Sequence, residues 1–149
     1  MGEAIPDKGE TPPAGIGFLL QRAHNRLRES MLAVLDGTGL HLGHIAILGS
    51  LATSGGLTQR QLIERTGIEK SSMVLFLDAL ERGGWARRHP HPSDRRAHLV
   101  ALTAEGGQRL ALIGPKLAAT EQKFLEILAP ADLEQLAISL ASLGQAPLP

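Results

Sequence analysis

The stretch LTQRQLIERTGIEKSSMVLFLDALERGGWARRHPHPSDRRAHLVALTAEG, residues 57–106, decides the fold. It begins with a short expected helix at 59–65, because Thr58 and Gln61 have the spacing of a capping box. A glycine-containing turn then leads into a second expected helix at 70–82. Two short helices joined by such a turn are typical of a helix-turn-helix, although any αα-hairpin in a helical bundle has the same pattern.

A β-hairpin is expected directly after these helices. Residues 85–89 and 96–102 have strand patterns, and the segment between them is dense in proline, serine and aspartate, which form turns. The tip of this hairpin is too polar to belong to a core. A helix-turn-helix followed at once by such a hairpin is a winged helix, which favours this fold over the generic αα-hairpin.

Amphipathic helices are expected on both sides of this segment. The apolar spacing predicts helices at 16–36 and 42–52 before it, and at 104–128 and from Pro130 onward after it. Gly114 and Pro115 should kink the helix at 104–128 near its middle. The apolar seam of that helix can pack inside its own domain or face a partner, and spacing does not separate the two. The fold class is therefore mainly α, with a small β-hairpin wing.

Composition limits the class of protein. The 149 residues include no cysteine, which excludes disulfides and thiolate chemistry, and the start of the chain lacks the apolar segment of a signal peptide. No apolar run is long enough to span a membrane, so we expect a cytoplasmic protein. The formal net charge is zero, but residues 57–103 carry eight basic and five acidic residues, a net charge of +3. The neutral total therefore excludes only binding by bulk charge.

Residues 57–106 resemble the winged-helix core of the MarR (multiple antibiotic resistance regulator) family of bacterial transcription regulators. The ordered markers are Leu57-Thr58, Leu62, Gly67-Ile68, Asp78, Leu80, Glu81, Gly84, Arg87-Arg88, Asp94-Arg95-Arg96, Leu102-Thr103 and Gly106. Each marker alone is weak, whereas their ordered combination is specific. Two expected helices before the motif and two after it extend the resemblance over roughly residues 16–143.

The resemblance implies a homodimeric DNA-binding regulator. Related proteins place two winged helices on a palindromic operator, act mostly as repressors, and often release DNA when a small ligand, commonly an aromatic acid, binds. The expected organisation is a disordered tail at 1–14, a single MarR-like domain at 15–143 and a second tail at 144–149. Within that domain, 57–103 is the winged helix-turn-helix DNA-binding lobe, and 15–36 and 104–143 are dimerisation helices.

We expect three groups of residues to contact DNA. The helix starting at Lys70 is the recognition helix, and the preceding helix start suits phosphate. Arg96 in the wing is expected to enter a minor groove, with Asp94 orienting its guanidinium through an ion pair; the alternative is a solvated wing tip. The candidate DNA contacts are Thr58, Gln59, Lys70, Ser71, Ser72, Val74, Leu75, Arg88, Asp94, Arg95 and Arg96.

Val74 and Leu75 depart from the polar or basic side chains that many relatives have there. Either they touch thymine methyl groups, or one of them packs inward and leaves specificity to few hydrogen bonds and DNA shape. This departure concerns base-level specificity rather than DNA binding itself.

Histidines suggest a ligand site or a metal site. Family geometry suggests a small-molecule pocket lined by Phe18, Arg22, His41 and His44, whose cationic groups could pair with a carboxylate or phenolate. The His41–His44 pair could instead bind a metal, which would make the protein a metal-responsive regulator. We favour the pocket and expect no metal and no cofactor.

Other functions are disfavoured. No catalytic serine elbow, phosphate-binding loop or HEXXH motif is present in the sequence, so we expect no enzyme and no catalytic residues. The main alternative to a DNA-binding regulator is a winged-helix dimer that serves as a protein-interaction module.

Overall fold

The computed structural model describes residues 15–146, which form six α-helices and one small antiparallel sheet. The elements are α1 (Ile16–Leu35), α2 (Leu42–Ala52), β1 (Leu57–Thr58), α3 (Gln59–Thr66), α4 (Lys70–Arg82), β2 (Ala86–Pro90), β3 (His98–Leu102), α5 (Ala104–Leu125) and α6 (Pro130–Gln145). The expected tail at 1–14 and residues 147–149 lie outside the described residues. The second expected tail begins too early, because α6 continues through residues 144 and 145. The mainly α class with a winged helix is confirmed.

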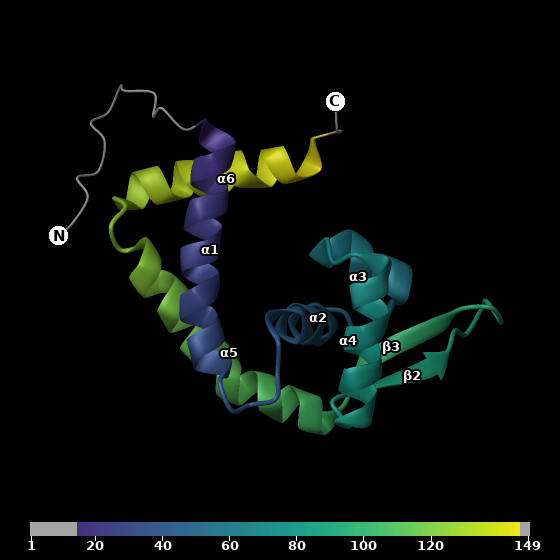
Figure 1. Cartoon of the computed structure of the whole chain (residues 1–149). Helices are drawn as coiled ribbons and strands as arrows, with labels where there is room; N and C mark the ends of the chain where they lie inside the picture. The colour runs from purple at the N-terminus through teal and green to yellow at the C-terminus, as the bar shows by residue number, and fades with distance from the viewer. Residues whose placement is uncertain (1–14, 147–149) are drawn as a thin grey trace.

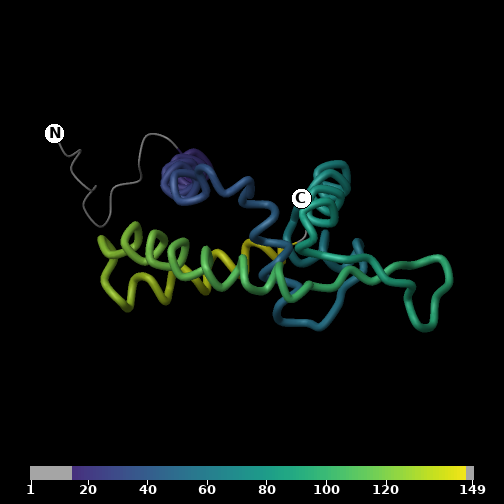
Figure 2. Tube along the Cα trace, turned by 90° about the horizontal axis from the view of Figure 1, so that it is seen from below, coloured from purple at the N-terminus to yellow at the C-terminus, as the bar shows by residue number. Residues whose placement is uncertain are grey.

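The elements form two parts joined by one helix. Figure 1 shows α1 and α6 on one side, and α2, α3, α4 and the hairpin on the other, with α5 running between them. Figure 2 shows the β2–β3 hairpin projecting from one end of the molecule. No helix in the described part of the chain is long and apolar enough to cross a membrane.

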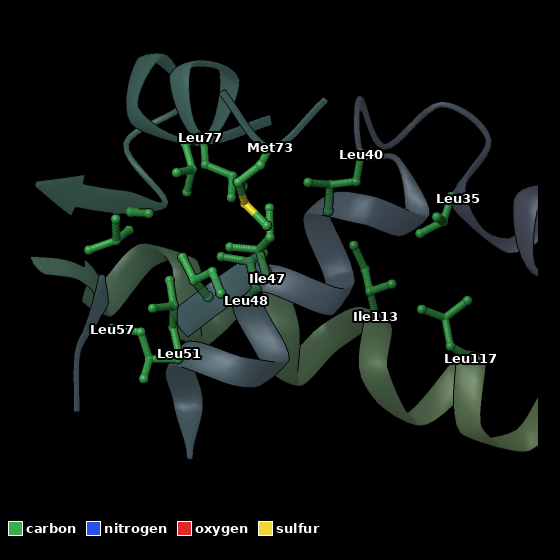
Figure 3. Close-up of a cluster of buried hydrophobic side chains, with 14 residues drawn as sticks. Leu35, Leu40, Ile47, Leu48, Leu51, Leu57, Met73, Leu77, Ile113 and Leu117 are labelled. Carbon is green, nitrogen blue, oxygen red and sulfur yellow. The ribbon is translucent and has the colours of Figure 1, made fainter. Parts of the chain in front are cut away.

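The core is built around α2. Ile47, Leu48 and Leu51 are fully or almost fully buried on this helix, and Met73 and Leu77 of α4 pack over them (Figure 3). Each such side chain contributes about 1.5–3 kcal/mol by leaving water. The same cluster extends to α5, so α2 holds the helix-turn-helix against the long helix.

The sheet has a strand that the sequence pattern did not predict. The strand order is β1-β3-β2, with Leu57 opposite Val100 and Arg88 also opposite Val100 on the other side. The two residues of β1 are too few to show the alternation that identifies a strand. The hairpin itself is confirmed, with strands at 86–90 and 98–102.

Local signals set the helix boundaries. Thr58 accepts a hydrogen bond from Gln61 N at 3.2 Å, and the Gln61 side chain accepts one from Thr58 N at 2.9 Å, so the capping box is confirmed. Gly67 ends α3 in the left-handed region at φ 67°, which favours glycine.

The long helix differs at its end from the sequence expectation. Pro115 lies inside α5, and the axis of α5 changes direction along its length in Figure 1, as expected for an internal proline. The helix expected at 104–128 ends at Leu125, however, and the chain turns through a hydrogen bond from Leu128 N to Leu125 O. Pro130 keeps Ala129 extended, because a proline disfavours helical geometry in the residue before it, but this effect does not reach back to Leu125.

Two adjacent glycines at the start of α5 have opposite surroundings and give a matched test. A Cβ at Gly106 would lie 2.0 Å from the carbonyl oxygen of Trp85, whereas a Cβ at Gly107 meets only Leu102 Cδ2 at 3.7 Å. Gly106→Ala should therefore lower the free energy of unfolding by at least about 2 kcal/mol, because backbone must move. Gly107→Ala should raise it by about 0.5–1 kcal/mol through helix propensity.

Urea unfolding at matched protein concentration measures both variants. Equal effects of the two substitutions would contradict the close approach of α5 to the Trp85 carbonyl.

Candidate nucleic-acid interface

Helix α4, the expected recognition helix, turns one face inward and the other toward solvent. Met73, Leu77 and Leu80 are buried at helical spacing. Lys70 and Ser71, in the first turn, are exposed. The N-terminal half of α4 is therefore available to a groove of DNA, as expected for the second helix of a helix-turn-helix.

Several of the expected DNA contacts meet in one groove between α3 and the wing. Thr58, Gln59, Arg88 and Arg96 all line this groove. A neighbouring groove between α3 and α4 brings Lys70 beside Gln59. Three separate segments of the sequence thus line two grooves that share Gln59 and Arg60.

The sequence analysis missed one cation on this surface. Arg60 lines both grooves and pairs with Glu64 at 2.9 Å, with both side chains largely exposed. The signal was present, because Arg60 is the second residue of the helix that Thr58 caps. An exposed pair of this kind contributes little to stability and can open toward a phosphate.

Arg88 faces the recognition helix. Its Nη2 lies 2.9 Å from Asp78 Oδ1, its Nη1 pairs with Glu81 Oε2, and its backbone N–H donates to Glu81 Oε1 at 3.0 Å. Partial burial lowers the pKa of Arg88, but the hydrogen bonds and charges of Asp78 and Glu81 outweigh it and raise that pKa above its ordinary value. Within one chain, this expected DNA contact connects β2 to α4.

In the wing tip, side chains accept hydrogen bonds from backbone amides, and the arginine side chains are exposed. His91 Nδ1 accepts hydrogen bonds from the backbone N–H groups of Ser93 and Asp94, both at 3.2 Å. Asp94 Oδ1 accepts from the backbone N–H of Arg96 at 2.9 Å, so the expected pair between this carboxylate and the Arg96 guanidinium is wrong. Aspartate often forms a local turn of this kind, in which its carboxylate accepts a hydrogen bond from the backbone amide two residues ahead. Among residues 15–146, neither Arg95 nor Arg96 forms an ion pair.

The outward face of α4 is polar at its start and apolar in its middle. Ser71 Oγ donates to Glu69 Oε1 at 2.9 Å, and Ser72 is half-buried. Val74 and Leu75 are 38% and 69% exposed, so neither packs into the core of the chain. Of the two alternatives that the sequence left open for Val74 and Leu75, inward packing of one of them is therefore not observed.

Two histidines build the start of α2. His41 Nδ1 accepts from Gly43 N at 3.1 Å, and His44 Nδ1 accepts from His41 N at 2.9 Å. His41 stacks on the Phe76 ring with centroids 5.2 Å apart, and His44 meets it edge-on at 4.9 Å. Both rings thus contact α4.

The same hydrogen bonds weaken the metal interpretation of this pair. Both Nδ1 atoms are already engaged by backbone amides, and His44 Nε2 is buried without a hydrogen-bond partner. Residues 15–146 contain no group of three or more histidine, aspartate or glutamate side chains placed to hold a metal ion.

The four residues expected to line one pocket lie in two places. Phe18 and Arg22 line a groove on α1 with Gln21, Asn25 and Arg26. About 20 Å of helix separates Arg22 from Leu35 at the end of α1, after which the chain leads to His41. Phe18 and Arg22 thus line a groove on α1 that does not include His41 or His44, and a single pocket formed by all four residues stays a prediction.

Comparisons with known proteins agree on one family. Residues 38–97 match the model described as the MarR family. The HTH-type transcriptional repressor MdtR of Bacillus subtilis (strain 168) is 27% identical over 131 residues, which cover 88% of this chain and 84% of MdtR.

Two solved structures share the fold at similar identity. CouR from Rhodococcus jostii RHA1, bound to p-coumaroyl-CoA, is 27% identical with a TM-score of 0.81, covering 90% of this chain and 94% of CouR. The PcaV transcriptional regulator from Streptomyces coelicolor, in complex with its natural ligand, is 28% identical with a TM-score of 0.75, covering 97% of this chain and 99% of PcaV.

His44 gives a prediction about pH. Burial, and then the nearby His41, lower the pKa of His44 from its ordinary value of 6.5. Below that value the unfolded chain binds more protons than the folded one, so the contribution of His44 is complete above about pH 6.5 and is lost as the pH falls. The free energy of unfolding should therefore decrease between pH 7 and pH 5.

His44→Gln is the matched control, because glutamine can still accept the His41 amide proton but does not titrate. Chemical denaturation across this pH range should give a shallower slope for the variant. Identical slopes for the two proteins would show that His44 does not titrate differently on folding.

Proposed function

Because the chain belongs to the MarR family of transcriptional regulators, we propose that it is a homodimeric repressor that binds a palindromic operator and is released by a small ligand. Proteins of this family regulate transcription and are not enzymes.

One observation carries the DNA-binding proposal: two exposed arginines lie at the wing tip, and one of them, Arg96, lines the groove between the wing and α3. Arg95 and Arg96 are exposed, and Arg96 shares that groove with Thr58 and Gln59 at the start of α3. Helix starts suit phosphate oxygens, and guanidiniums suit the negative potential of a narrow minor groove. The wing and α3 together therefore suit two phosphate backbones and the groove between them.

The proposed dimer rests on apolar surface that one chain leaves uncovered. Helix α6 has no buried residue. Within residues 15–146, and apart from Val74 and Leu75, the exposed large apolar residues all lie on α1, α5 or α6 or just after α5: Ile16, Phe18, Leu20, Leu112, Ile127, Ile138, Leu140 and Leu143. A second copy would cover this surface and leave the winged lobes free. A two-fold axis between the lobes would require a palindromic operator.

The proposed ligand is a small aromatic acid. The bound molecules in the CouR and PcaV structures support a small-molecule response. We assign its recognition to Phe18 and Arg22 on α1 or to His41 and His44 beside α4. Isothermal titration with salicylate-like acids, repeated on Arg22→Ala and on His44→Gln, identifies which pair takes part. Absence of both heat and DNA release across a broad panel would end this part of the proposal.

Arg96→Ala should weaken binding to DNA from upstream of the protein's own gene by about tenfold, since a positioned arginine contributes about 1–3 kcal/mol. Fluorescence anisotropy across a salt series measures this loss. Both proteins should show affinity that falls steeply with salt, because bound phosphates release counterions. Lys116→Ala, which removes an exposed cation from α5, is the control and should bind like the wild type.

Light scattering on the same samples should give about twice the chain mass of 15.8 kDa. A wild-type protein that ignores every such duplex at low salt would favour a protein-interaction module. A mass near one chain would remove the dimer from the proposal.

A further inference from the structure

Two neighbouring apolar side chains stand alone on the recognition helix. Val74 and Leu75 are 38% and 69% exposed, and every other exposed large apolar residue of the described chain lies on α1, α5 or α6 or just after α5. This pair is therefore separate from the surface assigned to the dimer. It lies one turn after the start of α4, on the half of the helix that would enter DNA.

The polar groups on the same face of α4 already have partners. Ser71 Oγ donates its proton to Glu69 Oε1, and Asp78 is paired with Arg88. The first contact joins Ser71 to the residue before α4, and the second joins α4 to β2, so both polar groups are engaged within the protein. Between these two positions, the side chains that α4 turns outward are Val74 and Leu75, which form no hydrogen bonds.

Cations lie at the start of α4 and on the helix and hairpin that pack against it. Lys70 stands at the start of the same helix, Arg60 is across the adjacent groove, and Arg95 and Arg96 are at the wing tip. A partner with an apolar centre and negatively charged edges fits such a surface. The major groove of DNA has these properties wherever thymine methyl groups lie between the two phosphate backbones.

We propose that Leu75, with Val74 beside it, reads the 5-methyl group of thymine in the major groove. This inference rests on the proposed DNA-binding function and specifies how the recognition helix selects its site. Each half-site should then contain a thymine opposite Leu75, recognised by apolar contact and not by a hydrogen bond. Thymine would be preferred over uracil, which has the same hydrogen-bonding groups but lacks the methyl group.

Replacing single thymines with deoxyuridine tests this reading directly. Duplexes enriched from a random-sequence library by the full-length protein supply the site, and each thymine is replaced in turn. Replacing the one thymine that Leu75 contacts in a half-site should weaken wild-type binding about fourfold, since burying a methyl group contributes about 0.8 kcal/mol and about 1.4 kcal/mol is a factor of ten. Thymines outside the selected site are the DNA control and should tolerate replacement.

Leu75→Ala should lose this discrimination and bind the thymine and deoxyuridine duplexes with affinities within about twofold of each other. Because Leu75 is exposed, the variant should fold like the wild type, which circular dichroism checks. Ser71→Ala is the matched variant on the same helix face. Ser71 is itself an expected DNA contact, so the control readout is the ratio of the affinities for the thymine and deoxyuridine duplexes, which should stay at the wild-type value.

The outcomes separate this inference from the proposed function. Failure to enrich or bind any duplex would reject DNA binding itself. Tight binding with no sensitive thymine would overturn only the methyl reading. Sensitivity that persists unchanged in Leu75→Ala would also overturn it, because another side chain would then contact the methyl group.

Discussion

One guanidinium joins the wing to the recognition helix. Arg88 on β2 binds Asp78 and Glu81 of α4 through its side chain, and its backbone N–H donates to Glu81 as well. Charge-assisted hydrogen bonds of this kind contribute about 1.5–3 kcal/mol when shielded, and less where the carboxylates are partly exposed, as they are here. Because both the strand backbone and its side chain are held, β2 cannot slide along α4 without breaking these contacts. The positions of the wing arginines relative to Lys70 follow from this connection.

The surface that is available to DNA consists of the exposed side chains that such intramolecular contacts do not engage. Asp78 and Glu81 neutralise Arg88, Glu69 engages Ser71, and Asp94 engages a backbone amide. The remaining groups are a few exposed cations and two apolar side chains on α4. Few phosphate contacts per chain give modest affinity, so a second copy on the same duplex would strengthen binding through effective concentration. A neutral chain can thus bind DNA through local charge.

The sequence predicted the features that depend on neighbouring residues. The capping box at Thr58 and the helix Lys70–Arg82 were both predicted correctly, because capping and amphipathic spacing are local. Strand alternation places Arg87 and Arg88 on opposite faces of β2, but it does not show that one of these faces meets two carboxylates of α4. Strand β1 exists only through pairing with β3, which no local pattern reveals. Local patterns also do not show whether the two pairs of the expected ligand pocket lie together, since distances between helices are set by packing.

The most direct measurement exchanges the charges of the central pair. Arg88→Asp alone should greatly weaken DNA binding. Adding Asp78→Arg should restore most of the affinity measured by fluorescence anisotropy, because the new pair can again hold β2 against α4. If Arg88 instead acts by contacting a phosphate, the double variant would bind DNA no better than Arg88→Asp. That result would contradict the role of Arg88 as the connection between the wing and the recognition helix.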